Sequence, residues 1–255
     1  MISKPGNTGF CLDGKTALVT GGASGIGFAV AKLFTQKGAT VCLVDINKKK
    51  AELAANSLSG AMAFQADVSD KKSVEKLVSD VIEKNKRIDV LVNSAGVGDI
   101  DWAESISEQT WRKVIDINLT GTFLVCQCVG RRMIEQGNGG KIVSVASQAG
   151  IVAIDKHVAY SASKAGVISM TKSLAYEWGK YGIQVNAVSP TSTETPMIVG
   201  YWDEPQRYKE TIKNLPAGRF CKPEEVAAAI LFLSSESSNM ITGENLVIDG
   251  GYTIH

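Results

Sequence analysis

The feature that most constrains this chain is the regular alternation of short apolar runs with helical patterns. The apolar runs lie at 15–20, 40–45, 88–96, 141–147, 183–190 and 244–251. Segments with helical spacing separate them, most cleanly where one face carries Val74, Leu77, Val78, Val81 and Ile82. Strands and helices that alternate in this way form a parallel sheet with helices on both faces. The sequence therefore predicts an α/β fold of this kind.

The longest expected helix begins near Ser107 and runs to about Gln136, with an apolar stripe at Trp111, Val114, Ile115, Leu119 and Phe123. Another helix is expected to begin at Pro223, because proline suits the first turn and the acids that follow it suit the positive end. No linker or internal repeat interrupts the 255 residues, so one domain over 1–255 is expected. The weakly periodic stretch 191–219 is the expected substrate lid.

Composition excludes some partners. The formal net charge is +1, which gives no electrostatic reason to expect nucleic acid or an anionic membrane surface. No apolar run reaches the length of a membrane span, and residues 1–14 lack a signal-peptide core. The five cysteines match no zinc or redox spacing, so free thiols in a reducing compartment are expected. The sequence predicts a soluble cytoplasmic protein without a metal site.

A glycine-rich turn follows the first apolar run, in the segment TGGASGIG at 20–27. Gly21, Gly25 and Gly27 stand between a strand and a helix, which is the context that a phosphate-binding turn requires. Such a turn brings the backbone close to a pyrophosphate at the helix N-terminus, where free N–H groups favour anions. A tight connection without a ligand is the alternative.

Asp45 ends the second apolar run, 24 residues after Gly21. A carboxylate at this point accepts hydrogen bonds from the ribose hydroxyls of NAD and repels the 2′-phosphate of NADP. An aspartate that only caps the following helix is the alternative. The glycine turn, strand and terminal acid together favour NAD binding.

Tyr160 and Lys164 are four residues apart, with only serine and alanine between them. In a helix they would stand on one face, one turn apart. A nearby ammonium favours the phenolate, although lowering the phenol pKa from about 10 to about 7 requires roughly 4 kcal/mol. By itself this pair is better explained as an ordinary exposed tyrosine and lysine on an amphipathic helix.

Several short motifs occur together with this pair. Ser147 lies thirteen positions before Tyr160, Asn118 lies in INLTG, and the chain contains NSAG at 93–96 and ASQAG at 146–150. With TGGASGIG and Y-x-x-x-K, these motifs resemble the short-chain dehydrogenase/reductase family from about Leu12 to Tyr252. The resemblance implies one Rossmann-type, doubly wound domain. It also implies hydride transfer between a nicotinamide cofactor and an alcohol or carbonyl carbon.

The resemblance also assigns roles by position. Tyr160 would be the general acid/base, Lys164 would lower its pKa and hold the nicotinamide ribose, Ser147 would orient the substrate oxygen, and Asn118 would hold a water. The expected cofactor residues are Gly21, Ser24, Gly25, Ile26, Gly27, Asp45, Asp67, Val68, Asn93, Ala95, Gly96, Tyr160, Lys164, Pro190, Thr193 and Thr195. Independently, Asn118 falls on the apolar stripe of its helix, where an unpaired amide costs about 1–3 kcal/mol. A bond to a neighbouring helix carbonyl would also satisfy it.

Three positions depart from the family pattern. Ser94 stands where a second asparagine is common, and this change should be tolerated. Thr191 replaces a glycine and Thr193 replaces a branched apolar residue. The backbone at Thr191 is the open question, because glycine adopts conformations that threonine does not.

The substrate is expected to be a small hydroxylated molecule. The lid and the loop before Tyr160 mix aromatic and polar residues, and the candidate substrate contacts are Gln148, His157 and Trp202. Such a lining suits a sugar alcohol and its ketose better than a steroid or fatty-acyl chain. Ordinary loop composition is the better explanation for any one of these residues taken singly, and for His157 the alternative is a cap of the loop that enters the helix.

The sequence thus predicts an NAD-dependent polyol or secondary-alcohol dehydrogenase. A 3-oxoacyl-[acyl-carrier-protein] reductase is the second enzyme hypothesis, and Asp45 counts against it because such reductases usually take NADPH. A non-catalytic NAD-binding regulator is the hypothesis from another class. The resemblance also implies a homotetramer. The stripe Val167, Met170, Leu174 and Trp178 would then lie at a subunit contact or in the core of the chain.

Overall fold

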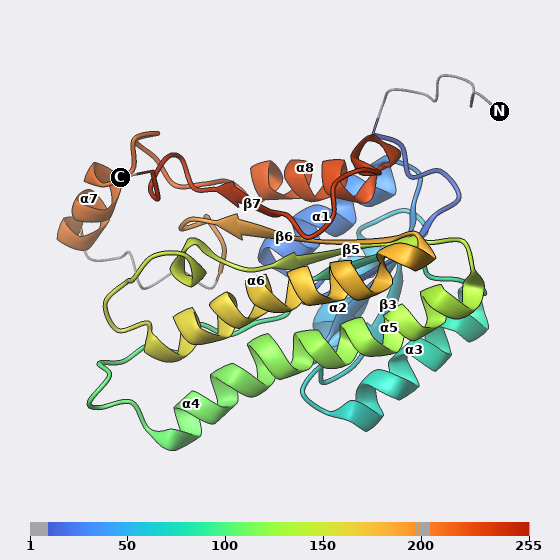
Figure 1. Ribbon diagram of the computed structural model, residues 1–255, viewed down its shortest axis with the longest axis horizontal. Helices are drawn as coiled ribbons and strands as arrows, with labels where there is room; N and C mark the ends of the chain where they lie inside the picture. The colour runs from blue at the N-terminus through green and yellow to red at the C-terminus, as the bar shows by residue number, and fades with distance from the viewer. Residues whose placement is uncertain (1–9, 197, 199–204, 255) are drawn as a thin grey trace.

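The computed structural model describes residues 10–196, 198 and 205–254, which form a seven-stranded parallel sheet (Figure 1). The strand order is β3-β2-β1-β4-β5-β6-β7. The strands are β1 Thr16–Thr20, β2 Thr40–Asp45, β3 Met62–Gln65, β4 Val90–Asn93, β5 Gly140–Val145, β6 Ile183–Pro190 and β7 Asn245–Ile248. The predicted doubly wound α/β fold is confirmed, with β3 as an additional short edge strand.

Helices cover both faces of the sheet, as Figure 1 shows. One face carries α1 Gly25–Gln36, α2 Lys48–Asn56 and α8 Pro223–Ser234, whose apolar residues share a core cluster with β1 and β2. The other face carries α3 Lys71–Asn85, α5 Thr122–Gln136 and α6 Val158–Trp178. Neighbouring residues within a strand point to opposite faces. Val19 accordingly belongs to the first core cluster and Leu18 to the second.

The long helix expected over 107–136 is interrupted. It consists of α4 Glu108–Ile115, a π-helical segment Asp116–Gly121 and α5. A π-helical turn adds a residue to the α-helical repeat and rotates the residues that follow it. The predicted stripe is partly wrong, because Trp111 before this segment and Phe123 after it are 38% and 39% exposed. Val114 and Asn118 are fully buried, so the expected inward position of Asn118 is confirmed.

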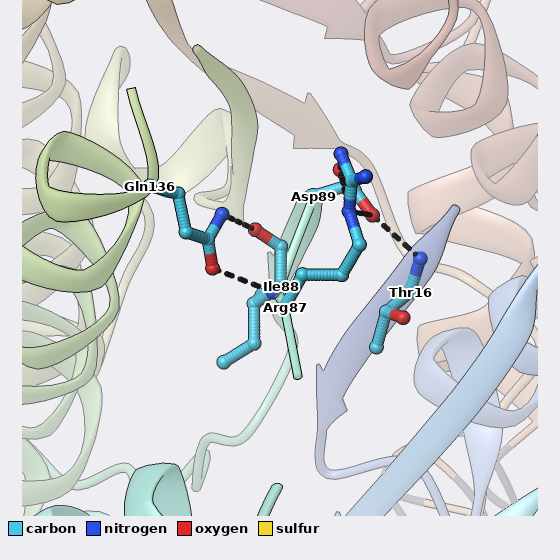
Figure 2. A network of polar contacts seen from close by, with 5 residues as sticks. All are labelled: Thr16, Arg87, Ile88, Asp89 and Gln136. Carbon is cyan, nitrogen blue, oxygen red and sulfur yellow. Dashed lines mark hydrogen bonds and ion pairs between the residues drawn. The ribbon is translucent and has the colours of Figure 1, made fainter. Parts of the chain in front are cut away.

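A polar network fixes the amino-terminal ends of β1 and β4 (Figure 2). The Asp89 carboxylate pairs with Arg87 and accepts a hydrogen bond of 2.9 Å from the Thr16 N–H. The Gln136 side chain at the end of α5 accepts a bond from the Ile88 N–H and donates one to the Ile88 carbonyl, both 2.9 Å. These contacts lie at the sheet edge opposite to the carboxyl ends of the strands.

The expected lid contains a helix that its weak periodicity did not reveal, α7 Pro205–Lys213. Trp202 lies outside the described residues. The stripe on α6 belongs to the core of this chain, since Val167 and Leu174 are buried and Met170 and Trp178 pack against the second cluster. The five cysteines are free thiols. Across the described residues, every helix falls short of the length and apolarity needed to cross a membrane.

Candidate active site

The carboxyl ends of β1, β2, β4, β5 and β6 meet around a cleft of about 460 Å³. The chain runs outward from β1 to β3 and then crosses to β4 on the other side of β1. Ligands of open α/β sheets bind at such a reversal of strand order. Most predicted site residues line this cleft, namely Gly21, Ser24, Gly25, Ile26, Asp45, Asp67, Val68, Ala95, Gly96, Ser147, Gln148, His157, Tyr160, Lys164, Pro190, Thr193 and Thr195.

The glycine turn leaves no room for side chains. Gly21 and Gly25 have φ values of +62° and +52°, which favour glycine. A Cβ atom on Gly27 would lie 2.3 Å from the Gly21 carbonyl oxygen, so Gly27 packs inside the turn rather than lining the cleft. The Ser24 side chain does not cap α1, which leaves the first-turn N–H groups for a ligand. This cradle fits the pyrophosphate of a dinucleotide.

Two carboxylates line the cleft beyond the glycine turn. Asp45 ends β2, and its Oδ1 accepts a bond of 2.9 Å from the Asn47 N–H. The cap of α2 is Asn47 rather than Asp45, so helix capping does not explain the aspartate. Asp67 accepts bonds of 2.9 and 2.6 Å from the N–H and hydroxyl of Ser69. Two carboxylates that can accept hydrogen bonds at these positions therefore fit the adenosine half of a dinucleotide.

The end of β4 is held close to the glycine turn. The Thr20 hydroxyl accepts bonds of 3.2 and 3.3 Å from the N–H groups of Ser94 and Ala95. Asn93 differs from the prediction because it lies beneath the cleft, only 3% exposed. Its amide donates 3.1 Å bonds to the Ser144 hydroxyl and the Cys126 sulfur. Asn93 thus supports β4 and β5 from below, while Ala95 and Gly96 reach the cleft.

Asn118 is fully buried in the π-helical segment and does not line the cleft. Its Oδ1 accepts a bond of 2.8 Å from the Val97 N–H, and its Nδ2 donates to the Val97 carbonyl at 3.0 Å. Nδ2 also donates to the Ser163 hydroxyl at 3.1 Å. The amide is therefore satisfied by the loop after β4 and by α6, rather than by a neighbouring helix carbonyl alone.

Ser147, Tyr160 and Lys164 converge on the cleft. Ser147 follows β5, and its hydroxyl accepts a bond of 3.1 Å from the Ala149 N–H. Tyr160 and Lys164 lie one turn apart on α6, with the Lys164 Nζ 5.6 Å from the centre of the Tyr160 ring. Lys164 is only 6% exposed and donates a bond of 2.7 Å to the Val145 carbonyl. The exposed-surface alternative for this pair is excluded.

Burial controls the ionisation of both groups. It raises the pKa of Tyr160, and the hydrogen bond with Ser147 acts in the opposite direction. Burial lowers the pKa of Lys164 to about 8. The overall shift of the phenol pKa is therefore upward rather than downward as expected, because removing the phenolate from water dominates. The pair still combines a tyrosine that can transfer a proton with a lysine whose charge changes near pH 8.

The end of β6 closes the cleft beside the glycine turn. A Cβ atom on Gly25 would lie 3.2 Å from the Thr195 methyl group. Threonine can replace the family's glycine at position 191, because the backbone there does not have a positive φ. In the described part of the chain, the non-glycine residues with positive φ are Lys86 and Lys156. The Thr191 N–H donates a bond of 3.1 Å to the Ile248 carbonyl. Threonine therefore fits this backbone without strain.

Two of the three candidate substrate residues lie at the cleft. Gln148 is 5% exposed, next to Ser147. His157 contacts the Tyr160 ring edge-on at 5.9 Å, and its Nδ1 lies 2.6 Å from the Asp155 carbonyl. The sequence did not predict the apolar wall formed by Val97, Ile100, Ile154 and Ile198. These residues stand singly in loops, so no periodic pattern marks them. Across the described residues, no cluster of His, Cys, Asp and Glu could hold a metal ion.

The fold and the cleft define a nicotinamide-dependent oxidoreductase. A family model described as enoyl-(acyl carrier protein) reductase matches residues 21–253. A crystal structure of a short-chain type dehydrogenase/reductase from Mycobacterium marinum superposes with a TM-score of 0.90 at 32% identity, over 96% of this chain and 98% of the other. The chain belongs to the short-chain dehydrogenase/reductase family.

Three characterised relatives align over nearly the whole chain. An NAD-dependent glycerol dehydrogenase of Listeria innocua serovar 6a is 49% identical over 246 residues, 96% of each chain. A D-threitol dehydrogenase of Mycolicibacterium smegmatis is 51% identical over 249 residues, 96% of this chain and 95% of the relative. A 3-oxoacyl-[acyl-carrier-protein] reductase of Thermotoga maritima is 44% identical over 248 residues, 95% of this chain and 99% of the relative.

Proposed function

We propose that this protein is an NAD-dependent dehydrogenase that oxidises a secondary alcohol of a small polyol to the ketose. The observation that carries the proposal is the convergence of Ser147, Tyr160 and Lys164 on the same cleft as Asp45 and the glycine turn. The two relatives near 50% identity act on glycerol and D-threitol, which supports a polyol as the substrate class.

In the proposed mechanism, Tyr160 is the general base. Its phenolate takes the proton of the substrate hydroxyl while the Ser147 hydroxyl orients the same oxygen. Lys164, one turn further along α6, stabilises the phenolate as long as it carries its charge. A nicotinamide cofactor, held by the glycine turn, Asp45 and Lys164, would supply the hydride acceptor for the substrate carbon. Asn118 fixes the loop after β4 through both of its bonds to Val97.

The proposed preference for NAD rests on Asp45. Its carboxylate ends β2 at the cleft, where the 2′-phosphate of NADP would meet a negative charge. Lys48, Lys49 and Lys50 begin the following helix and are exposed. No lysine of this run lines the cleft among the residues that the structure describes. The carboxylate therefore outweighs the nearby basic residues in the choice of cofactor.

A 3-oxoacyl-[acyl-carrier-protein] reductase remains the second candidate, favoured by the relative at 44% identity. Asp45 counts against it, since a reductase of that kind usually takes NADPH. A non-catalytic NAD-binding regulator is the candidate from another class. The joint presence of Ser147, Tyr160 and Lys164 at one cleft argues against it, because a regulator has no need of a proton carrier.

We also propose that the protein is a cytoplasmic homotetramer. Free thiols at all five cysteines suit a reducing compartment. Trp111 and Phe123 on the helical face are 38% and 39% exposed, which suits burial against another subunit. Light scattering should give four times the chain mass of 27.1 kDa. A mass equal to that of one chain would reject the tetramer.

The Tyr160→Phe variant tests the catalytic proposal. Polyol oxidation with NAD should fall by about 10²–10⁴-fold, the range of a general acid/base contribution. NADH binding, followed by its fluorescence, should persist because the rest of the cleft is intact. Tyr181→Phe, an exposed tyrosine after α6, is the matched control. Oxidation at the wild-type rate by Tyr160→Phe would reject Tyr160 as the base.

A further inference from the structure

The side chain of Gln148 is an unusual group in the cleft. It is 5% exposed and lines the cleft in the short 3₁₀ turn Gln148–Gly150 that follows Ser147. Its Oε1 is buried and has no hydrogen-bond partner among the described residues. A terminal amide can turn over and exchange its oxygen and nitrogen, so either atom can face the cleft. Gln148 therefore offers a hydrogen-bond acceptor that the described residues leave unused.

An unpaired amide inside a protein is costly, and such groups normally have a partner. Ile100, Ile154 and Ile198 of the same cleft are apolar and can supply none. His157 already has a partner for its Nδ1 in the Asp155 carbonyl. A polar group of a bound ligand is then the partner that the Gln148 amide lacks.

We propose that Gln148 is a specificity-determining residue that binds a second hydroxyl of the substrate, on the carbon next to the reacting one. This inference rests on the proposed function, in which Ser147 and Tyr160 bind the reacting oxygen. Gln148 follows Ser147 in the chain, and both residues line the cleft. A polyol carries a hydroxyl on the carbon next to the reacting one, and that hydroxyl can donate a hydrogen bond to the unpaired acceptor. The site thereby recognises a diol unit, and a monohydric alcohol leaves the amide unpaired.

The test compares two substrates with the same carbon skeleton, butane-2,3-diol and butan-2-ol, in the wild type and in Gln148→Leu. Leucine has nearly the volume of glutamine and no hydrogen-bonding group. For the diol, kcat/KM should fall by about tenfold or more, as expected for one lost neutral hydrogen bond. For the monohydric alcohol it should change by less than about twofold, since no bond is lost. The control is Gln184→Leu, at the opposite end of β6, whose amide bonds the Gly182 carbonyl.

The outcomes separate this inference from the proposed function. A selective loss on the diol in Gln148→Leu, with Gln184→Leu unchanged, supports it. Equal losses on both alcohols, or no loss, would overturn it while leaving the dehydrogenase proposal intact. Wild-type protein that oxidises neither alcohol nor any polyol with NAD would reject the proposed function first. NADH fluorescence on each variant checks that the dinucleotide site is unchanged.

Discussion

At the Tyr160 hydroxyl, two physical effects oppose each other. Burial disfavours the phenolate, and the Ser147 hydroxyl stabilises it through a hydrogen bond. Lys164 is subject to the same burial, which lowers its pKa to about 8. Near neutrality Tyr160 is therefore the neutral phenol, and Lys164 is still mostly protonated, although less completely than a free lysine. The chemistry depends on moving one proton between Tyr160 and the substrate.

The pH dependence of alcohol oxidation follows from these directions. The base form of Tyr160 is required, and its raised pKa means that this form accumulates only as the pH rises. The rate of oxidation with NAD should therefore increase from pH 6 to pH 8, while ketose reduction should decrease. Above pH 8 the loss of charge on Lys164, whose pKa is about 8, should oppose this increase. Initial rates over this range test the prediction. An oxidation rate that is already constant below pH 7 would contradict a phenol with a raised pKa.

At Asp45 a single charge is expected to select the cofactor. Asp45→Ser removes the carboxylate. The ratio of kcat/KM for NAD to kcat/KM for NADP should then fall by about tenfold or more, because the variant no longer repels the 2′-phosphate. Asp70→Asn is the matched control, since this carboxylate caps α3 and lies outside the cleft. An unchanged ratio in Asp45→Ser would show that other residues select the cofactor.

At the level of elements, the entry to α8 depends on an ionised carboxylate. Glu225 accepts two bonds from Arg219, of 2.6 and 2.8 Å, and one of 2.8 Å from the Lys222 N–H. The Arg219 guanidinium and the Lys222 N–H lower the pKa of Glu225 to about 2. A lowered folded-state pKa adds stability above the usual pKa near 4.5 and loses it as the pH falls towards 2.

Glu225→Gln should therefore lower the free energy of unfolding slightly at pH 7, since the pair is exposed to solvent. The difference from the wild type should shrink as the pH falls from 5 towards 2. Urea unfolding at several pH values measures it. Glu224→Gln removes a charge from the same helical turn without these bonds and should lack that pH dependence. A difference that stays constant with pH would reject the role of the ionised form.

The Gln136 side chain joins α5 to the start of β4 (Figure 2). Gln136→Leu leaves the Ile88 N–H and carbonyl without these partners, which should destabilise the fold by about 1–3 kcal/mol. Turnover should be unchanged because the network lies at the opposite edge of the sheet from the cleft. Gln127→Leu, on the same helix, keeps both bonds and serves as the control in thermal unfolding. Equal midpoints for the two variants would show that the amide contributes nothing.

The sequence predicted helices and strands correctly where a hydrophobic pattern extended over many residues. It failed where a local irregularity or a very short strand left no such pattern. The strands and most helices followed from apolar runs and helical spacing. The π-helical segment 116–121 has no such signal, and the predicted stripe failed on both sides of it, where Trp111 and Phe123 are exposed, while Asn118 within it is buried. β3 was missed because it is an edge strand of only four residues, in which Phe64 alone is buried.

Across the whole molecule, the cleft gathers residues from Gly21 to Ile198, because all parallel strands end at one edge of the sheet. Short sequence motifs predicted the polar residues of this site. Asn93 was misjudged because its motif gives a position in the chain but not the direction of its side chain beneath the cleft. The isoleucines of the wall were missed since only the folded chain brings isolated loop residues together.

The proposed activity of this molecule is the oxidation of a small polyol with NAD. The most direct test measures initial rates at 340 nm with glycerol and D-threitol against NAD and NADP, and in the reverse direction with a 3-oxoacyl thioester and NADH or NADPH. We predict the fastest turnover for a polyol with NAD. Preference for the thioester with NADPH would contradict both the substrate class and the role of Asp45. Turnover of no substrate, with NADH still bound, would favour a non-catalytic regulator.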